Sequence, residues 1–439
     1  MSSTKEVSIS SVSDNTEKAS LFPILLVNFI GALGYSLVLP FLIILVLSLG
    51  GNEVIYGILG ATYSFFQLIG APVLGKWSDE QGRKKILLLS QAGTFIAWLL
   101  FLVALLIPET QLISVDSAIT GAFILTIPLA LLFIARALDG ITGGNISVAN
   151  AYLSDISTEK NRKSNFGKMA ASANLGFIVG PALAGLLGST ILEEKLPVMV
   201  TMGISLIAIL VIQFMLKESN PCAREEQTQT GRIKKVLGAE LKDCYTDDSS
   251  QKASFIQIIK MEWIGFILIL YFLIFLSFNF FYVAFPVHAI QALDWDLFQL
   301  GIFFSVMGGI LVFVQGPVLT WISDKVSEAW LIILGSTLLA LGFFFFTNSE
   351  LWKIYVAVTL FALGNGVMWP SFLTVLSQKA GKELQGVIQG YASSTGSLAS
   401  IIGLLSGGVL YSLIGGILFL IPAILMALIG IISLRFLKS

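Results

Sequence analysis

Two charged side chains three residues apart inside an apolar stretch are the first candidates for chemistry. Arg136 and Asp139 are the only Asp, Glu, Lys or Arg residues away from the ends of the membrane spans assigned below. A charge at the centre of a bilayer costs about 2.5–3.5 kcal/mol on insertion scales, so both side chains should face the protein interior or a cavity. At a spacing of i, i+3 they share one helix face and can interact.

This pair has two interpretations. Burial disfavours the carboxylate form of Asp139, whereas the guanidinium of Arg136 favours it. Substrate or a conformational change could tip that balance and load or release a proton, which makes the pair a candidate proton-coupling site. The alternative is a static, neutralised pair that helps to assemble the helices. Asp139 is the only acidic residue inside the spans and away from their ends, so it would carry a coupled proton alone, unless the coupling ion is a different one.

The amino-acid composition predicts that membrane-spanning helices hold these two residues. Of 439 residues, 56% are hydrophobic and 12% are charged, and the mean hydropathy is +0.87. A soluble protein cannot hide so much apolar surface, and a bilayer span needs about 20 apolar residues. We predict an all-α membrane protein with twelve transmembrane helices in two six-helix bundles, at about 21–47, 54–76, 86–107, 130–154, 165–190, 197–216, 262–287, 299–322, 330–348, 352–377, 386–411 and 414–436.

The distribution of Lys and Arg predicts the orientation. Of 26 such residues, Lys195 and Lys353 fall on one side, Arg136 lies within a span, and the other 23 fall on the second side, which we take as the cytoplasm. Both termini, the polar tail 1–20 and the linker 217–261 are then cytoplasmic. No Asn-x-Ser/Thr sequon falls in an external loop, which favours a bacterial cytoplasmic membrane. The two cysteines lie in the linker and indicate neither a disulfide framework nor a metal site.

An internal repeat divides the chain into bundles at 21–216 and 262–437. PVLGKWSDE, starting at Pro72, is similar to PVLTWISDK, starting at Pro317, at an offset of 245, and a second set of matches has an offset of 223. Transporters built from paired bundles show repeats of this kind. The difference of 22 residues places an additional segment at 108–129. We expect it outside the membrane, either as an external elaboration or as a short interfacial helix.

A dense block of charge follows the second span and carries a family resemblance. The segment G-x-x-x-D-x-x-G-R-K-K resembles the signature loop of the major facilitator superfamily, at Gly75, Asp79, Gly82, Arg83 and Lys84. The resemblance implies that Asp79 sits against the start of the eleventh helix, near Leu384–Val387, and that Arg83 pairs with Asp155. These contacts would hold the cytoplasmic side of the transporter in its closed state. The plain alternative is a positively charged cytoplasmic anchor between two spans.

Two further stretches are similar to drug exporters of that superfamily. The fifth span resembles the antiporter motif at Gly176, Gly180, Pro181 and Gly185, with Ala184 in place of a glycine. Small residues let helices pack backbone to backbone, which is also the simpler explanation of the pattern. The fourth span resembles tetracycline efflux proteins, and Arg136 matches the buried arginine that this family links to proton coupling. The resemblance therefore favours the proton-coupling interpretation of Arg136 and Asp139.

Polar side chains in the spans are candidates for a substrate cavity. The first and fourth spans and their repeat mates line the cavity in this family, so we favour Asn28, Tyr35, Asn145 and Asn365. Other candidates are Gln67, Asn174, Asn279, Tyr282, Gln315, Trp369 and Tyr391. An apolar, aromatic cavity with few charges suits an amphipathic organic solute. His288, the single histidine, is predicted to be a polar residue at the outer end of its helix.

We therefore predict a secondary active transporter that exports a hydrophobic or aromatic compound in exchange for protons. The expected partners are a small organic substrate, protons and the lipid bilayer, with no nucleic acid, no cofactor and a monomeric protein. An enzyme is not expected, and Gly70–Trp77 fails the phosphate-loop pattern at the hydroxyl position. One alternative is a proton-coupled importer of a small metabolite or siderophore. Another is a membrane sensor that does not transport.

Overall fold

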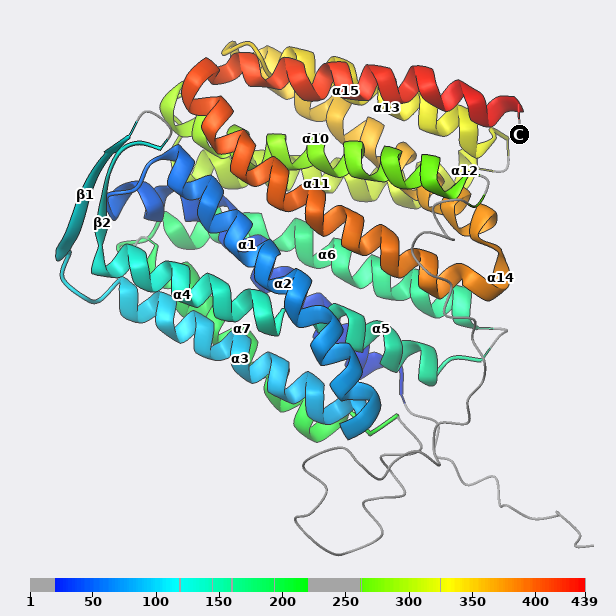
Figure 1. Ribbon diagram of the computed structural model, residues 1–439, viewed down its shortest axis with the longest axis horizontal. Coiled ribbons are helices and arrows are strands. Elements are labelled where there is room, and N and C mark those ends of the chain that lie inside the picture. The colour runs from blue at the N-terminus through cyan, green and yellow to red at the C-terminus, as the bar shows by residue number, and fades with distance from the viewer. Residues whose placement is uncertain are drawn as a thin grey trace, which may run out of the picture.

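The computed structural model describes residues 20–117, 120–143, 145–158, 161–192, 194–219, 261, 263–323 and 325–438. In this part of the chain long helices pack side by side, and one two-stranded antiparallel sheet lies at an end of the bundle (Figure 1). The first half contains α1 (Phe22–Ser48), α2 (Glu53–Gln81), α3 (Arg83–Ala104), β1 (Gln111–Ser117), β2 (Gly121–Thr126), α4 (Ile127–Thr142), α5 (Asn145–Asp155), α6 (Arg162–Gly188) and α7 (Lys195–Met215).

The second half begins after the linker, almost all of which lies outside the described residues. It contains α10 (Ile264–Gln291), α11 (Leu297–Phe313), the π-helical turn η2 (Val314–Val318), α12 (Leu319–Ile322), α13 (Glu328–Phe345), α14 (Leu351–Ile414), the 3-10 turn η3 (Gly415–Phe419), α15 (Leu420–Ile432) and the 3-10 turn η4 (Ser433–Lys438). Asp324, the repeat mate of Asp79, also lies outside the described residues.

The helices match the twelve predicted spans. Ten segments of the described chain are long and apolar enough to cross a bilayer. The helix α1 adds another, bent by 43° between Val38 and Pro40, because proline cannot donate a helix hydrogen bond. The segment Gly390–Leu437 has 48 residues, or about 72 Å of helix at 1.5 Å per residue, which is enough for two spans. Gly415, with a φ of 55°, separates those two.

Helix α14 contains both the tenth and the eleventh predicted spans. It is helical over 64 residues, yet Trp369 and Gly396 both lie against Tyr271. In a straight helix these two positions would be about 40 Å apart, so α14 must turn back on itself between them. In Figure 1 this reversal lies beside the label α14. Residues 379–385 read KAGKELQ, and all of them except the glycine are good helix formers. The helical conformation can therefore continue through this stretch.

The segment 108–129 forms a β-hairpin, so the predicted interfacial helix is wrong. The strand QLISVDS alternates apolar and polar residues and pairs with β2 in antiparallel register. The backbone N–H of Ile124 donates to Gly50 O at 2.8 Å, and Asn52 Nδ2 donates to Thr120 O at 2.7 Å. The hairpin is therefore fixed to the turn between α1 and α2, and we call this end of the molecule the hairpin end.

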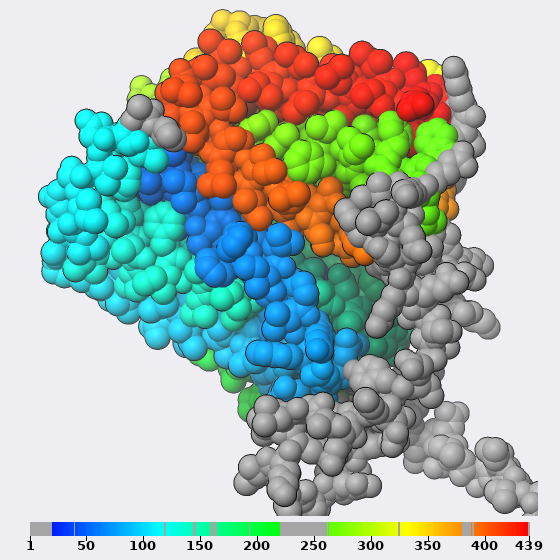
Figure 2. All heavy atoms as spheres, viewed as in Figure 1, coloured from blue at the N-terminus to red at the C-terminus, as the bar shows by residue number. Residues whose placement is uncertain are grey.

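Glycines bring the two halves into close contact near the hairpin end. A Cβ atom built on Gly57 of α2 would lie 3.3 Å from Gly408 Cα of α14. One built on Gly185 of α6 would lie 3.2 Å from Gly301 Cα of α11. Figure 2 shows orange atoms of α14 against blue atoms of α2. Two helix pairs thus cross backbone to backbone between the halves.

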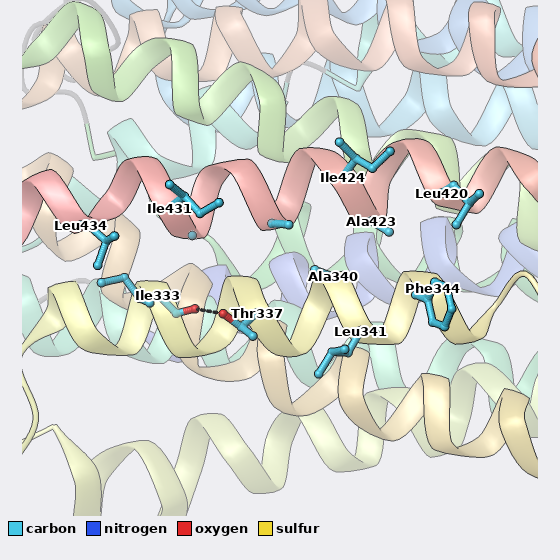
Figure 3. A pocket seen from close by; sticks show the side chains of 12 residues that line it. Ile333, Thr337, Ala340, Leu341, Phe344, Leu420, Ala423, Ile424, Ile431 and Leu434 are labelled. Atoms are coloured by element: carbon cyan, nitrogen blue, oxygen red, sulfur yellow. Dashed lines mark hydrogen bonds between the residues drawn. The ribbon is translucent and has the colours of Figure 1, made fainter.

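The core of the second half is built from phenylalanine. Fully buried rings from α10, α11, α13, α14 and η3 pack on one another at centroid distances of about 4–6.5 Å, among them Phe281, Phe285, Phe303, Phe343, Phe346, Phe361 and Phe419. An apolar groove of about 520 Å³ lies between α13 and α15 (Figure 3). Its one hydroxyl, that of Thr337, donates within its own helix to Ile333 O. The groove lies on helices away from the boundary between the halves.

Candidate functional site

Arg136 and Asp139 form a buried ion pair on α4. Their exposed fractions are 4% and 6%, and Arg136 Nη1 lies 3.4 Å from Asp139 Oδ2. This contact is long for a charge-assisted hydrogen bond, which is usually 2.7–2.9 Å. Arg136 Nε is buried with no hydrogen-bond partner among the described atoms. With both groups ionised the pair is neutral, and the guanidinium keeps one donor that the described structure does not use.

Tyrosines surround this pair, and sequence analysis singled out only some of them. The Arg136 guanidinium carbon lies 4.7 Å from the centroid of the Tyr63 ring on α2. Tyr35 of α1 packs on Tyr63 at 5.6 Å and lies close enough to Arg136 and Asp139 to interact with both electrostatically. The guanidinium over an aromatic face is a cation–π contact. Tyr63 was missed because nothing in the sequence shows that α2 packs against the fourth span at this level.

The tyrosines continue across the boundary between the halves. Tyr56 Oη of α2 donates to the carbonyl oxygen of Tyr282 on α10 at 3.5 Å. The phenol groups of Tyr282 and Tyr35 lie near each other across this boundary. We call Tyr35, Tyr56, Tyr63 and Tyr282 the tyrosine cluster. It joins the buried charges of one half to the facing helix of the other half.

Side chains of α2 and α3 bind the end of α4, just after the ion pair. The helix α4 ends at Thr142 with Gly143 as its C-cap, and the predicted span 130–154 continues with α5 from Asn145. Gln67 Nε2 donates to Gly143 O at 3.2 Å and to Tyr63 Oη at 3.1 Å. Ser90 of α3 donates to the carbonyl of Thr142. These contacts hold Tyr63 beside Arg136.

The signature loop forms the ion pair that was predicted for it. Arg83 Nε lies 3.1 Å from Asp155 Oδ2, and Arg83 Nη1 contacts both the Asp79 carboxylate and Ser78 Oγ. The predicted contact of Asp79 with the start of a helix near Leu384–Val387 remains a prediction, because the side chains of these residues lie outside the described part of the structure. In the structure Asp79 pairs with Arg83, one helical turn away.

The small residues of the antiporter pattern pack α6 on two different helices. A Cβ on Gly176 would lie 2.7 Å from Leu33 N, and one on Gly180 would lie 2.8 Å from Leu37 N, both in α1. Gly185, in contrast, faces α11 of the other half. Pro181 lies inside α6 between these two contact sites.

The second half repeats this arrangement. Gly180 and Gly185 correspond at the offset of 223 to Gly403 and Gly408, of which the first packs on α10 and the second on α2. The pattern is therefore a packing device that is present in both halves. By itself it does not reveal the direction of transport.

The predicted cavity residues have different surroundings. Asn28 donates to Met169 O at 2.8 Å and to Ser172 Oγ at 2.9 Å, so it joins α1 to α6. Tyr35 belongs to the tyrosine cluster. Asn365 Oδ1 is buried with no hydrogen-bond partner among the described atoms, which leaves an acceptor for a ligand. The side chain of Asn145 lies outside the described part of the structure.

Two of the other candidates meet across the halves. Asn174 Nδ2 of α6 donates to Gln315 Oε1 of η2 at 2.8 Å. His288 is buried, and its Nδ1 lies 3.1 Å from Tyr411 Oη near the hairpin end. It lies in the last turn of α10 and is buried there. Among the described residues, no group of three His, Cys, Asp or Glu side chains could hold a metal ion.

Comparison with known proteins identifies the family. The model of the Major Facilitator Superfamily matches residues 24–404, which is most of the chain. The protein belongs to the major facilitator superfamily. The predicted fold class is thereby confirmed: an all-α, multi-pass membrane transporter with twelve helices, and not an enzyme.

Several bacterial relatives are similar over nearly their whole length. The tetracycline resistance protein of class H from Pasteurella multocida is 28% identical over 93% of this chain and 94% of its own. The tetracycline resistance protein of class E from Escherichia coli is 27% identical over 88% of this chain and 87% of its own. Multidrug resistance protein 2 of Bacillus subtilis is 27% identical over 90% of each chain. The resemblance to tetracycline efflux proteins is thus confirmed.

Solved structures of the superfamily share the fold. A D-xylose–proton symporter has a TM-score of 0.71 at 16% identity and covers 95% of this chain and 98% of its own. A human organic anion transporter has a TM-score of 0.67 at 18% identity and covers 96% of this chain and 100% of its own. At these identities the likeness concerns the fold alone.

Proposed function

We propose that this superfamily member exports a hydrophobic or aromatic organic compound in exchange for inward-moving protons. The observation that carries the proposal is the buried Arg136–Asp139 pair, which faces the tyrosine cluster at the boundary between the halves. Asp139 would bind the proton, and Arg136 would stabilise its carboxylate after release. The aromatic rings offer contact surface to an amphipathic solute. Relatives named for tetracycline and multidrug resistance support the same class of substrate.

Protonation and substrate binding would compete at this site. With Asp139 ionised the pair is neutral, and with Asp139 protonated the site carries the unbalanced charge of Arg136. A buried unbalanced charge is costly, so the two states favour different surroundings. Rocking of 21–216 against 262–437 about the fixed site would then deliver the proton to one side and the substrate to the other.

We place the termini and the signature loop in the cytoplasm of a bacterial cell, with the hairpin end outside. The excess of Lys and Arg at the end that carries the signature loop supports this orientation. Because one chain contains both halves of the site, we propose that a monomer suffices.

Energised everted vesicles test this function directly. An aromatic fluorescent compound from a broad drug panel should accumulate inside vesicles that contain the protein, and an uncoupler should release it. Vesicles from cells without the protein are the control. If the same gradient moved substrate out of everted vesicles, the protein would be an importer. If no compound of the panel moved, the export proposal would be rejected.

A further inference from the structure

His288 is a buried titratable side chain that the proposed function does not use. It is the single histidine of the chain and is 4% exposed. Its Nδ1 lies 3.1 Å from Tyr411 Oη of α14, whereas its Nε2 is buried with no hydrogen-bond partner among the described atoms. The Phe419 ring lies against it at 5.6 Å between centroids, and a Cβ atom built on Gly416 would lie 3.0 Å from its Cε1. The imidazole therefore has one hydrogen-bonded nitrogen and one in apolar surroundings.

Tyr411 carries this contact to the other half of the molecule. One turn before it in α14, Gly408 packs on the start of α2: a Cβ atom built there would lie 2.9 Å from Glu53 O and 3.3 Å from Val54 Cα. The Tyr411 phenol and the Glu53 carboxylate lie near each other across this boundary. His288, Tyr411 and Glu53 thus link α10 and α14 to α2 at the hairpin end, and we call them the outer cluster.

The hairpin fixes the α2 side of the outer cluster. Asn52, the residue before Glu53, caps α2 by accepting from Ile55 N at 3.0 Å. Its Nδ2 also donates to Thr120 O at 2.7 Å. The start of α2 is thus held by the hairpin of its own half. Opening of this end must therefore separate Tyr411 from Glu53.

The charges that face His288 come from few elements. On α14 the facing titratable group is Tyr411, and on α2 it is Glu53. The other helices packed on α10 are α1, α15 and η3, and none of them contains an Asp, Glu, Lys, Arg or His residue. Asp294 and Asp296 follow His288 in the chain and are exposed. The Glu53 carboxylate therefore balances a charge on His288 through the Tyr411 hydroxyl.

Protonation of His288 would place a charge where the closed end accommodates it poorly. An imidazolium donates from both ring nitrogens, and Nε2 has no acceptor among the described atoms. A buried charge without a full set of partners costs free energy. If this end opened, water could solvate the ring. A proton therefore favours the open state, because a ligand shifts a conformational equilibrium toward the state that binds it better.

We propose that His288 is a second proton-binding residue, and that a proton taken up there from the outside opens the hairpin end. This proton enters and leaves on the same side, so it is distinct from the transported proton that we assign to Asp139. The inference rests on the proposed alternating-access function. It adds a means by which an acidic exterior turns the site toward the side from which protons enter.

The first test measures opening of the hairpin end without substrate. Spin labels on Thr190→Cys and Ser349→Cys, which are exposed positions of different halves, report the separation. Every protein carries Asp139→Asn and lacks Cys222 and Cys244. Between about pH 8 and about pH 5, where an ordinary histidine gains its charge, the ratio of long to short distances should rise about tenfold if the open state binds the proton about tenfold more tightly.

Three variants assign this response. His288→Asn can still hydrogen-bond to Tyr411 but cannot be protonated, so its ratio should not change with pH. Glu53→Gln removes the balancing carboxylate of the closed state and should enlarge the rise. Asp116→Asn, which removes an exposed carboxylate of the hairpin, is the matched control and should behave as its parent. An unchanged rise in His288→Asn, or no rise in its parent, would overturn the proposal.

The single histidine allows a second, direct readout. In protein that contains isotope-labelled histidine and no histidine tag, the ring signals of His288 report its protonation by NMR without overlap from another histidine. The ring should become charged over the same pH interval in which the distances lengthen. A ring that titrates while the distances stay fixed, or a ring that stays neutral while they lengthen, would refute the coupling. Because neither readout needs transport, failure of the export assay would reject the proposed function and leave this result standing.

Discussion

At the scale of residues, the buried charges could be predicted and their surroundings could not. Arg136 and Asp139 stand out because a charged side chain inside a membrane span is costly and therefore rare. Tyr63, which lies against Arg136, is one of many aromatic residues in the spans and carries no local signal. Its importance depends on how α2 packs against α4, and this is a property of the tertiary structure.

Tyr63 gives a prediction at this scale. Tyr63→Leu removes the aromatic face under the Arg136 guanidinium and should slow transport about tenfold, since a desolvated cation–π contact contributes up to about 2 kcal/mol. Tyr63→Phe keeps the ring and should slow transport less than threefold. Initial rates of proton-driven uptake into everted vesicles measure both. Equal losses in the two variants would show that the hydroxyl, and not the ring, matters.

At the scale of elements, the positions of the spans followed from hydropathy, whereas the breaks in them did not. The reversal inside α14 and the π-helical turn η2 arise where tertiary contacts override local propensity. The hairpin was mistaken for a helix because its alternating apolar pattern is short and its strands are stabilised by the turn at Gly50. The contact of Asp79 with a helix start near Leu384–Val387 was inferred from the family alone and remains a prediction.

The antiporter pattern yields a prediction about packing. Gly180→Leu should destabilise the protein because a side chain there meets the backbone of α1, and overpacking typically costs about 1–3 kcal/mol. The expected result is a melting temperature several degrees lower in detergent. Gly167→Leu is the matched control, since a Cβ there has no atom within 4 Å in the structure. A control that melts as early as Gly180→Leu would contradict the packing explanation.

At the scale of the whole molecule, the repeat predicted two similar halves but not the contacts between them. The crossings at Gly57–Gly408 and Gly185–Gly301 relate pairs of helices that are distant in the sequence. Asn174 and Gln315 were candidate cavity residues, and the structure shows them hydrogen-bonded to each other. Facing positions of this kind depend on the angle at which the halves meet, which one sequence does not define.

The Asn174–Gln315 contact gives a prediction about motion between the halves. A short bifunctional thiol reagent that joins Asn174→Cys to Gln315→Cys, in a background without Cys222 and Cys244, should abolish at least nine-tenths of transport. Reductive cleavage of the linker should restore it. Each single cysteine variant treated in the same way should keep its activity. Undiminished transport after complete cross-linking would mean that the halves do not separate here.

The central claim is that Asp139 carries the transported proton. The most direct measurement is the release of a pre-formed proton gradient from everted vesicles when substrate is added, with wild type and Asp139→Asn compared at equal protein amounts. Wild type should release the gradient in proportion to substrate, and Asp139→Asn should release no protons. Equal release by both proteins would contradict the claim and leave Arg136 and Asp139 as a structural pair.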